Sequence, residues 1–141
     1  MPANDPILIV EDNKDERFFY QMAFNDLQIK NKLIFFENGA EALEYLQTTR
    51  DNLFLIICDM KMPKMDGLDF RQRVYNNPYL RKKGTPFVFR TGSANHKDIV
   101  KAYDLTVQGF FEKTHDLEKF KKQLKTIIDY WKESLEPNSN L

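Results

Sequence analysis

A run of six apolar residues that ends in a carboxylate constrains this chain more than any other feature. The run covers residues 53–58, Asp59 follows it directly, and a proline-containing loop then ends in Asp66-Gly67. An apolar run of this length between turn signals is typical of a strand buried on both faces, although a buried helix segment gives the same pattern. A strand here would place Asp59 at its carboxyl end, where open α/β sheets form their ligand crevices. We therefore take Asp59 as the first candidate for a reactive residue.

Strand-like and helical patterns alternate along the rest of the chain. Short runs of branched and aromatic residues indicate strands, and apolar residues repeated every three to four positions indicate amphipathic helices. Asn76-Asn77-Pro78 would stop a helix, and the Arg-Lys-Lys-Gly sequence of residues 81–84 indicates a solvated turn. The expected strands are residues 6–10, 33–36, 53–58, 86–90 and 107–111, and the expected helices are residues 14–28, 40–47, 67–75, 95–105 and 117–135.

This alternation predicts a (βα)5 fold, a doubly wound five-stranded parallel sheet with helices on both faces. Right-handed crossovers would place all the carboxyl ends of the strands on one edge of the sheet. Polar residues follow four of the expected strands, namely Glu11 and Asp12, Asp59, Thr91, and Lys113. Residues scattered at random would not be expected to gather at these ends, so we predict a functional site on this edge.

Length and charge narrow the class of protein further. The chain has 141 residues, the size of one ordinary domain, and its 21 basic residues balance its 21 acidic residues. This balance gives no electrostatic footprint for nucleic acid or for an anionic membrane, and the single cysteine favours a reducing cytoplasm. We expect one domain over residues 1–141, with a core at about 6–135 and short flexible tails at 1–5 and 136–141.

The residues at the strand ends suggest phosphoryl transfer. Carboxylates of Glu11, Asp12 and Asp59 in one cleft would repel one another and need a cation, and oxygen ligands favour Mg²⁺. A carboxylate can itself attack phosphorus to form an aspartyl phosphate. The Lys113 ammonium and the Thr91 hydroxyl could then neutralise and bind the transferred group. Each residue taken alone has a simpler interpretation as a turn, cap or solvated residue, so the prediction depends on the joint pattern.

Four motifs carry a resemblance to a known family. They are Glu11-Asp12, the segment from Asp59 to Gly67, Thr91-Gly92-Ser93, and the Phe-Phe-Glu-Lys sequence that ends at Lys113. Together they resemble the receiver domain of bacterial two-component response regulators, and in particular stand-alone receivers paired with photoreceptor or sensor kinases of the phytochrome type. The resemblance covers roughly residues 6–135 and implies a flavodoxin-like fold with strand order 2-1-3-4-5.

The resemblance also implies a role for each site residue. Asp59 would accept a phosphoryl group from a histidine kinase or a phosphotransfer protein. Mg²⁺ would bind the side chains of Asp12 and Asp59 and the backbone carbonyl of Lys61, with Glu11 acting through water. Lys113 would contact the phosphoryl group. The domain would be a phosphoacceptor with self-catalysed transfer and dephosphorylation, and not an enzyme that turns over a separate substrate.

The family's switching residues would be Thr91 and Phe110. They would couple the phosphoryl group to the face made by helix 95–105, strand 107–111 and helix 117–135, which would bind an output protein. The same face is the candidate interface for a homodimer. The segment after Lys113 has room for one helix and a short tail, so we expect no DNA-binding module. No apolar run approaches the length needed to span a membrane, so we expect no membrane partner.

One position departs from the family pattern, and three alternatives to the family function stay open. Thr114 stands where many receivers have a proline after the lysine, often in a cis bond, so we expect a trans or strained bond here. The alternatives are a phosphate-independent interaction module, an aspartate-nucleophile phosphatase and a flavin-binding flavodoxin. Lys61 disfavours the phosphatase because that mechanism needs an acid there, and the acidic Glu11-Asp12 loop would repel a flavin phosphate.

Overall fold

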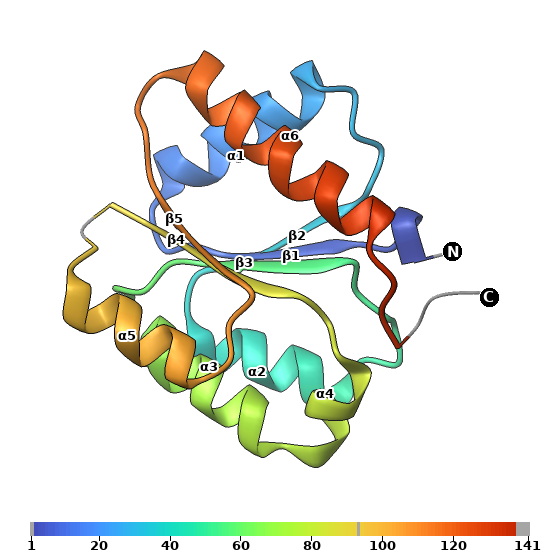
Figure 1. Cartoon of the computed structure of the whole chain (residues 1–141), viewed down its shortest axis with the longest axis vertical. Helices are drawn as coiled ribbons and strands as arrows, with labels where there is room; N and C mark the ends of the chain where they lie inside the picture. Colours follow the sequence, from blue (N-terminus) through green and yellow to red (C-terminus); the bar gives the residue numbers. More distant parts are fainter. Residues whose placement is uncertain (1, 93, 138–141) are drawn as a thin grey trace.

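Five parallel strands form one sheet in the order β2-β1-β3-β4-β5 (Figure 1). This order confirms the flavodoxin-like topology expected from the sequence. The computed structural model describes residues 2–92 and 94–137. Its strands are β1 (Ile7–Val10), β2 (Leu33–Phe36), β3 (Leu55–Cys58), β4 (Phe87–Thr91) and β5 (Gly109–Glu112), and its α-helices are α1 (Lys14–Asp26), α2 (Gly39–Thr48), α3 (Gly67–Asn76), α4 (Pro78–Lys83), α5 (His96–Asp104) and α6 (Leu117–Glu133).

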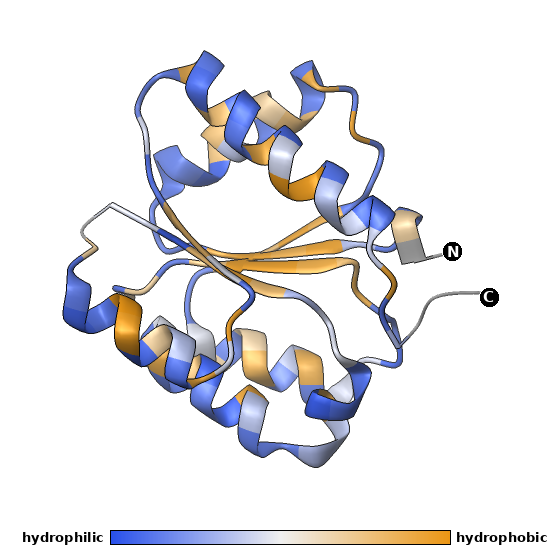
Figure 2. Cartoon of the chain, viewed as in Figure 1, coloured by the Kyte–Doolittle hydropathy of each residue, from blue (hydrophilic) through white to orange (hydrophobic). Residues whose placement is uncertain are grey.

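Alternate residues of the strands build two separate apolar layers. Ile7 and Ile9 of β1 pack in the layer beneath α1 and α6, whereas Leu8 and Val10 pack toward the helices of the opposite face. Side chains of successive strand residues point to opposite faces, so strands buried on both faces must be apolar throughout. Figure 2 shows this arrangement as apolar strands between helices whose outer faces are polar. Within the Leu53–Asp59 stretch, residues Leu55–Cys58 therefore form the central strand β3, and the stretch is not a helix.

The six α-helices of the described chain begin with the same chemistry. An asparagine or aspartate side chain accepts a hydrogen bond from the backbone amide three residues later, which satisfies one of the free amides of the first turn. The sequence predicted only the cap at Asp116. The capping residues are Asn13, Asn38, Asp66, Asn77, Asn95 and Asp116.

The structure corrects the sequence-based prediction at α4. Residues 81–84 were expected as a solvated turn, but Pro78–Lys83 is a short helix and only Gly84 lies beyond it. Pro78 fits the first helical turn because its missing amide needs no partner there. Gly84 ends the helix at φ +63°, in the left-handed region that glycine adopts without a steric penalty.

The expected flexible tails are in part ordered against the body of the fold. Pro2–Asn4 forms one turn of 3₁₀ helix, and the Asn31 side-chain amide donates to the carbonyls of Ala3 at 2.9 Å and Asp5 at 2.7 Å. Pro137 lies beside Gly84, since a Cβ atom on that glycine would meet its ring at 2.6 Å. Residues 138–141 of the expected tail lie outside the described residues. No helix in the described part of the chain is long and apolar enough to cross a membrane.

Candidate phosphoacceptor and metal site

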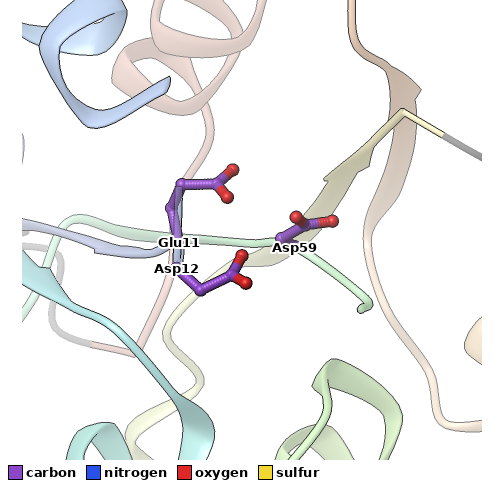
Figure 3. A group of neighbouring side chains, drawn as sticks. All are labelled: Glu11, Asp12 and Asp59. Carbon is purple, nitrogen blue, oxygen red and sulfur yellow. The ribbon is translucent and has the colours of Figure 1, made fainter. Parts of the chain in front are cut away.

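Three carboxylates meet at the carboxyl edge of the sheet. Ligand oxygens of Glu11, Asp12 and Asp59 all lie within 4.8 Å of one another, and Figure 3 shows the three side chains converging on one space. Glu11 and Asp12 follow β1, and Asp59 follows β3. Glu11 and Asp59 are buried while Asp12 is exposed, so the cluster opens to solvent on the side of Asp12.

Backbone hydrogen bonds extend the sheet one residue into the site. The Asp59 amide donates to the Val10 carbonyl at 3.0 Å, and the Lys113 amide donates to the Thr91 carbonyl at 2.8 Å. These bonds continue the parallel ladders β1–β3 and β4–β5. The backbones of Asp59 and Lys113 are therefore held by the same hydrogen-bond pattern as the strands.

Lys113 joins the two buried carboxylates. Its Nζ atom lies 2.7 Å from Glu11 Oε1 and 3.0 Å from Asp59 Oδ2. Burial opposes its charge, but the hydrogen bonds and negative charges of Glu11 and Asp59 outweigh burial and raise the pKa of Lys113. The structure thus brings the lysine predicted after β5 to the carboxylates predicted after β1 and β3.

The site holds more negative charge than Lys113 can balance. Burial, and then the charge of Asp59, raise the pKa of Glu11 to about 7, and the hydrogen bond and charge of Lys113 offset this shift only in part. Asp12 adds a third carboxylate at the open side. An oxygen-only donor set with surplus negative charge fits a hard divalent cation. The residues present therefore suit a divalent cation, while Mg²⁺ as that ion, with Asp12 and Asp59 as side-chain ligands and Glu11 acting through water, stays a prediction.

A close packing of backbone fixes the loop after Asp59. The Met60 amide donates to Asp59 Oδ1 at 2.7 Å, and the Gly67 amide donates to the Met60 carbonyl at 2.8 Å. A Cβ atom on Gly67 would lie 2.3 Å from the Asp59 carbonyl oxygen and 2.7 Å from a ring carbon of Phe89. Gly67 is therefore needed for this close approach. The Lys61 side chain is exposed and its Nζ atom lies 3.9 Å from Asp98 Oδ2, while the role of its carbonyl as a metal ligand stays a prediction.

Thr91 and Phe110, the predicted switch residues, lie on neighbouring strands. Thr91 is buried at the end of β4, and its hydroxyl makes no hydrogen bond to Asp59 or Lys113 within the described residues. Phe110 is half-buried on β5, and its ring centroid lies 5.9 Å from that of Phe89. Their switching role stays a prediction. Ser93, the third residue of the Thr-Gly-Ser motif, lies outside the described residues.

The described residues contain no cis peptide bond, so the Lys113–Thr114 bond, expected to be trans or strained, is trans. Thr114 supports the loop in another way, since its hydroxyl accepts a hydrogen bond from the Asp116 amide at 3.3 Å.

Sequence reasoning missed two side chains that bond each other near the site, Arg90 and Gln123. Arg90 is fully buried on β4, one residue before Thr91, and it donates to the Gln123 side chain of α6 at 2.9 Å. The available signal was an arginine inside the otherwise apolar Phe-Val-Phe-Arg-Thr strand, which the sequence-based prediction took only as the end of that strand.

Comparisons with known proteins agree with this geometry. The family model described as the response regulator receiver domain matches residues 7–125. Response regulator Rcp1 of Synechocystis is 30% identical over 94% of this chain and 94% of its own length. Among solved structures, the phosphorylated cyanobacterial phytochrome response regulator RcpA superposes with a TM-score of 0.83 at 27% identity, covering 96% of this chain and 99% of that chain. The Mn²⁺-bound form of Rcp1 superposes with a TM-score of 0.79 at 29% identity, covering 94% and 98%. The chain belongs to the response regulator receiver domains of two-component systems.

Proposed function

We propose that the protein is a cytoplasmic phosphorylation switch in which Asp59 accepts a phosphoryl group from a histidine kinase or a phosphotransfer protein. One observation carries this proposal. The Lys113 ammonium lies between Glu11 and Asp59, at 2.7 and 3.0 Å, and the exposed carboxylate of Asp12 lies beside them. A nucleophilic carboxylate, a fixed cation and an acidic metal site are the parts that phosphoryl transfer to aspartate requires.

In the proposed step, a carboxylate oxygen of Asp59 forms the new bond to phosphorus. The imidazole nitrogen of the donor leaves with the electrons of the broken P–N bond and takes up a proton. Lys113, already bound to Asp59 Oδ2, stays close enough to contact the incoming phosphoryl oxygens. Asp12, Asp59 and the Lys61 carbonyl would hold Mg²⁺, with Glu11 bound through water. When bound, the ion neutralises charge on the phosphoryl group.

The signal would leave the site through Thr91 and Phe110. Both lie on the sheet face that α5 covers. Arg90 contacts α6 on the other face, so the next residue, Thr91, points to the α5 side, and Phe110 packs against Phe89 on that same side. We propose that Thr91 moves toward the phosphoryl group and lets Phe110 turn inward. The responding surface would be α5, β5 and α6, where Val100 and Tyr103 of α5 are about half exposed. This surface would bind the output protein or a second copy of the chain.

The relatives support a sensor kinase as the phosphodonor. RcpA is a cyanobacterial phytochrome response regulator, and Rcp1 matches this chain over nearly the full length of both proteins. We propose a histidine kinase of the photoreceptor or sensor class as the upstream partner. The phosphatase alternative has no support at Lys61, which offers an ammonium where a second acid would be required.

The test is phosphoryl labelling of Asp59. We expect a small phosphodonor such as acetyl phosphate to label the protein in the presence of Mg²⁺ and not after its chelation, as read by intact mass. Asp59→Asn should abolish labelling, and Asp69→Asn on the exposed first turn of α3 should label normally. If Asp59→Asn labels as well as the unaltered protein, the assignment is wrong. Steady release of inorganic phosphate from phosphate esters would instead favour the phosphatase.

A further inference from the structure

A fully buried arginine lies on β4, one residue before Thr91 and on the sheet face that α1 and α6 cover. Arg90 is 0% exposed, and its guanidinium carbon lies 3.9 Å from the ring centroid of Phe120 and 5.2 Å from that of Tyr20. Val88, two residues earlier on the same face, shows that an apolar side chain fits this layer. Burying a charged group without partners is unfavourable, so the hydrogen bonds of Arg90 show what the residue holds in place.

The hydrogen bonds of Arg90 reach two helices on the same face of the sheet. Its Nε atom donates to Gln123 Oε1 of α6 at 2.9 Å, and Nη1 donates to Glu16 Oε2 of α1 at 3.3 Å and to the Tyr20 hydroxyl at 3.4 Å. Its Nη2 atom is buried and has no partner among the described residues. The bond to Gln123 is the shortest of these contacts.

Gln123 links Arg90 by hydrogen bonds to the loop that carries Lys113. Arginine has only donors, so Gln123 must present its carbonyl oxygen to Arg90 and its amide nitrogen elsewhere. That nitrogen donates to the Glu112 carbonyl at 3.0 Å. The Glu112 carbonyl belongs to the peptide group whose nitrogen is the Lys113 amide, and this amide donates to the Thr91 carbonyl at 2.8 Å.

We propose that Arg90 and Gln123 are positioning residues for Lys113 in phosphoryl transfer. The peptide group before Lys113 is held on its carbonyl by Gln123 and on its amide by Thr91. Arg90 fixes which way the Gln123 amide points. Without this clamp, the Lys113 ammonium would no longer be restricted to its place between Glu11 and Asp59. The inference rests on the proposed function of Asp59 and deepens it.

The test is a double-mutant cycle between Gln123 and Lys113. Gln123→Leu should slow labelling by acetyl phosphate about tenfold, the size expected for one hydrogen bond and the misplacement that follows. In a Lys113→Ala background, the same change should have no further effect, because the group it positions is absent. Gln72→Leu is the matched control, since Gln72 is an exposed glutamine of α3 whose side chain bonds Asn76 alone among the described residues.

Two further variants separate positioning from folding. Gln123→Glu keeps an acceptor for Arg90 but cannot donate to the Glu112 carbonyl, so it should fold normally and label as slowly as Gln123→Leu. Arg90→Met removes the buried cation and leaves Glu16, Tyr20 and Gln123 without its hydrogen bonds, so it should lower the free energy of unfolding and, in the folded protein, slow labelling. The affinity for Mn²⁺, measured by electron paramagnetic resonance, should stay within twofold in all three variants because the carboxylates are unchanged.

The ¹⁵N signal of the Lys113 ammonium gives a readout that needs no labelling. In Gln123→Leu it should move toward the signals of solvent-exposed lysines. The proposal fails if this signal is unchanged, if Gln123→Leu labels like the unaltered protein, or if it slows labelling equally with and without Lys113. A failure of the proposed function differs, because Asp59→Asn would then still be labelled.

Discussion

The two ends of the sheet hold buried cations in opposite ways. At the carboxyl end, Lys113 lies between the carboxylates of Glu11 and Asp59. At the amino end, the buried Arg71 of α3 bonds only neutral acceptors within the described chain. Its Nε atom donates to the Leu105 carbonyl at 2.8 Å, and Nη2 donates to the Thr106 carbonyl at 3.1 Å and hydroxyl at 2.9 Å.

This contrast separates a structural clamp from a reactive site. Burial lowers the pKa of Arg71, and the ring of Phe87 lies 5.1 Å from its guanidinium carbon, so neutral dipoles and aromatic rings solvate this cation permanently. The negative charge of Glu11, Asp12 and Asp59 is not balanced in this way, because the pKa of Glu11 is raised to about 7 despite its contact with Lys113. Surplus negative charge that one ammonium cannot balance leaves room for a metal ion and a phosphoryl group. We therefore expect changes at the carboxyl end to alter labelling and changes at the amino end to alter stability.

The largest effect should come from removing the cation at the carboxyl end. We expect Lys113→Ala to slow labelling by acetyl phosphate about 100- to 1,000-fold, the usual cost of losing one group aimed at the charge that develops in the transition state. The check is the initial rate of labelling by intact mass. Lys122→Ala on the exposed side of α6 should label normally. A rate within twofold of the unaltered protein for Lys113→Ala would remove the contrast between the two ends.

Gly67 should connect stability and labelling at the carboxyl end. Gly67→Ala places a Cβ atom 2.3 Å from the Asp59 carbonyl, and overpacking of this kind costs about 3 kcal/mol or more of unfolding free energy. Because the displaced backbone carries Asp59, labelling should slow as well. Urea titration and labelling rates measure the two effects. Gly92→Ala is the packing control at the same edge, since the nearest atom to its Cβ would be Lys113 Cδ at an ordinary 3.7 Å, and it should leave the free energy of unfolding unchanged.

Arg71 tests the other side of the comparison. Arg71→Met removes the three hydrogen bonds of the buried guanidinium to Leu105 and Thr106, so the free energy of unfolding should fall by about 2 kcal/mol. The labelling rate of the folded protein should not change. Arg73→Met on the exposed face of the same helix should have no effect on stability. Slower labelling in folded Arg71→Met would mean that the amino end also serves the site.

The sequence predicted the carboxyl end better than the amino end for a physical reason. In a parallel sheet, the strand order alone brings Glu11, Asp59 and Lys113 together, so the strand pattern was enough to predict their meeting. Arg71 and Arg90 depend on side-chain paths to acceptors 34 and 33 residues away along the chain. No local periodicity indicates such partners, and only the unusual arginine in a buried strand signalled Arg90.

The missed helix α4 has a different cause, because its start and stop signals were present in the sequence. Asn77-Pro78 stops α3 and also begins α4, since one asparagine can cap the next helix and proline is favoured at the first helical position. The same two residues therefore signal both the end of α3 and the start of α4. The prediction used only the first, and the basic run that followed was taken as a turn.

The smallest expected effect tests the role of Asn77 as the N-cap of α4. Its Oδ1 atom accepts a hydrogen bond from the Leu80 amide at 3.1 Å, so Asn77→Ala should reduce the free energy of unfolding by about 1 kcal/mol, the usual value of a helix cap. Asn76→Ala, one residue earlier and exposed, should cost less, because within the described part of the chain its side chain bonds only the exposed Gln72. Urea titration of both variants makes the comparison. Equal losses of unfolding free energy in the two variants would mean that α4 gains nothing from its cap. An unchanged labelling rate in Asn77→Ala would again separate the amino end of the sheet from the chemistry at Asp59.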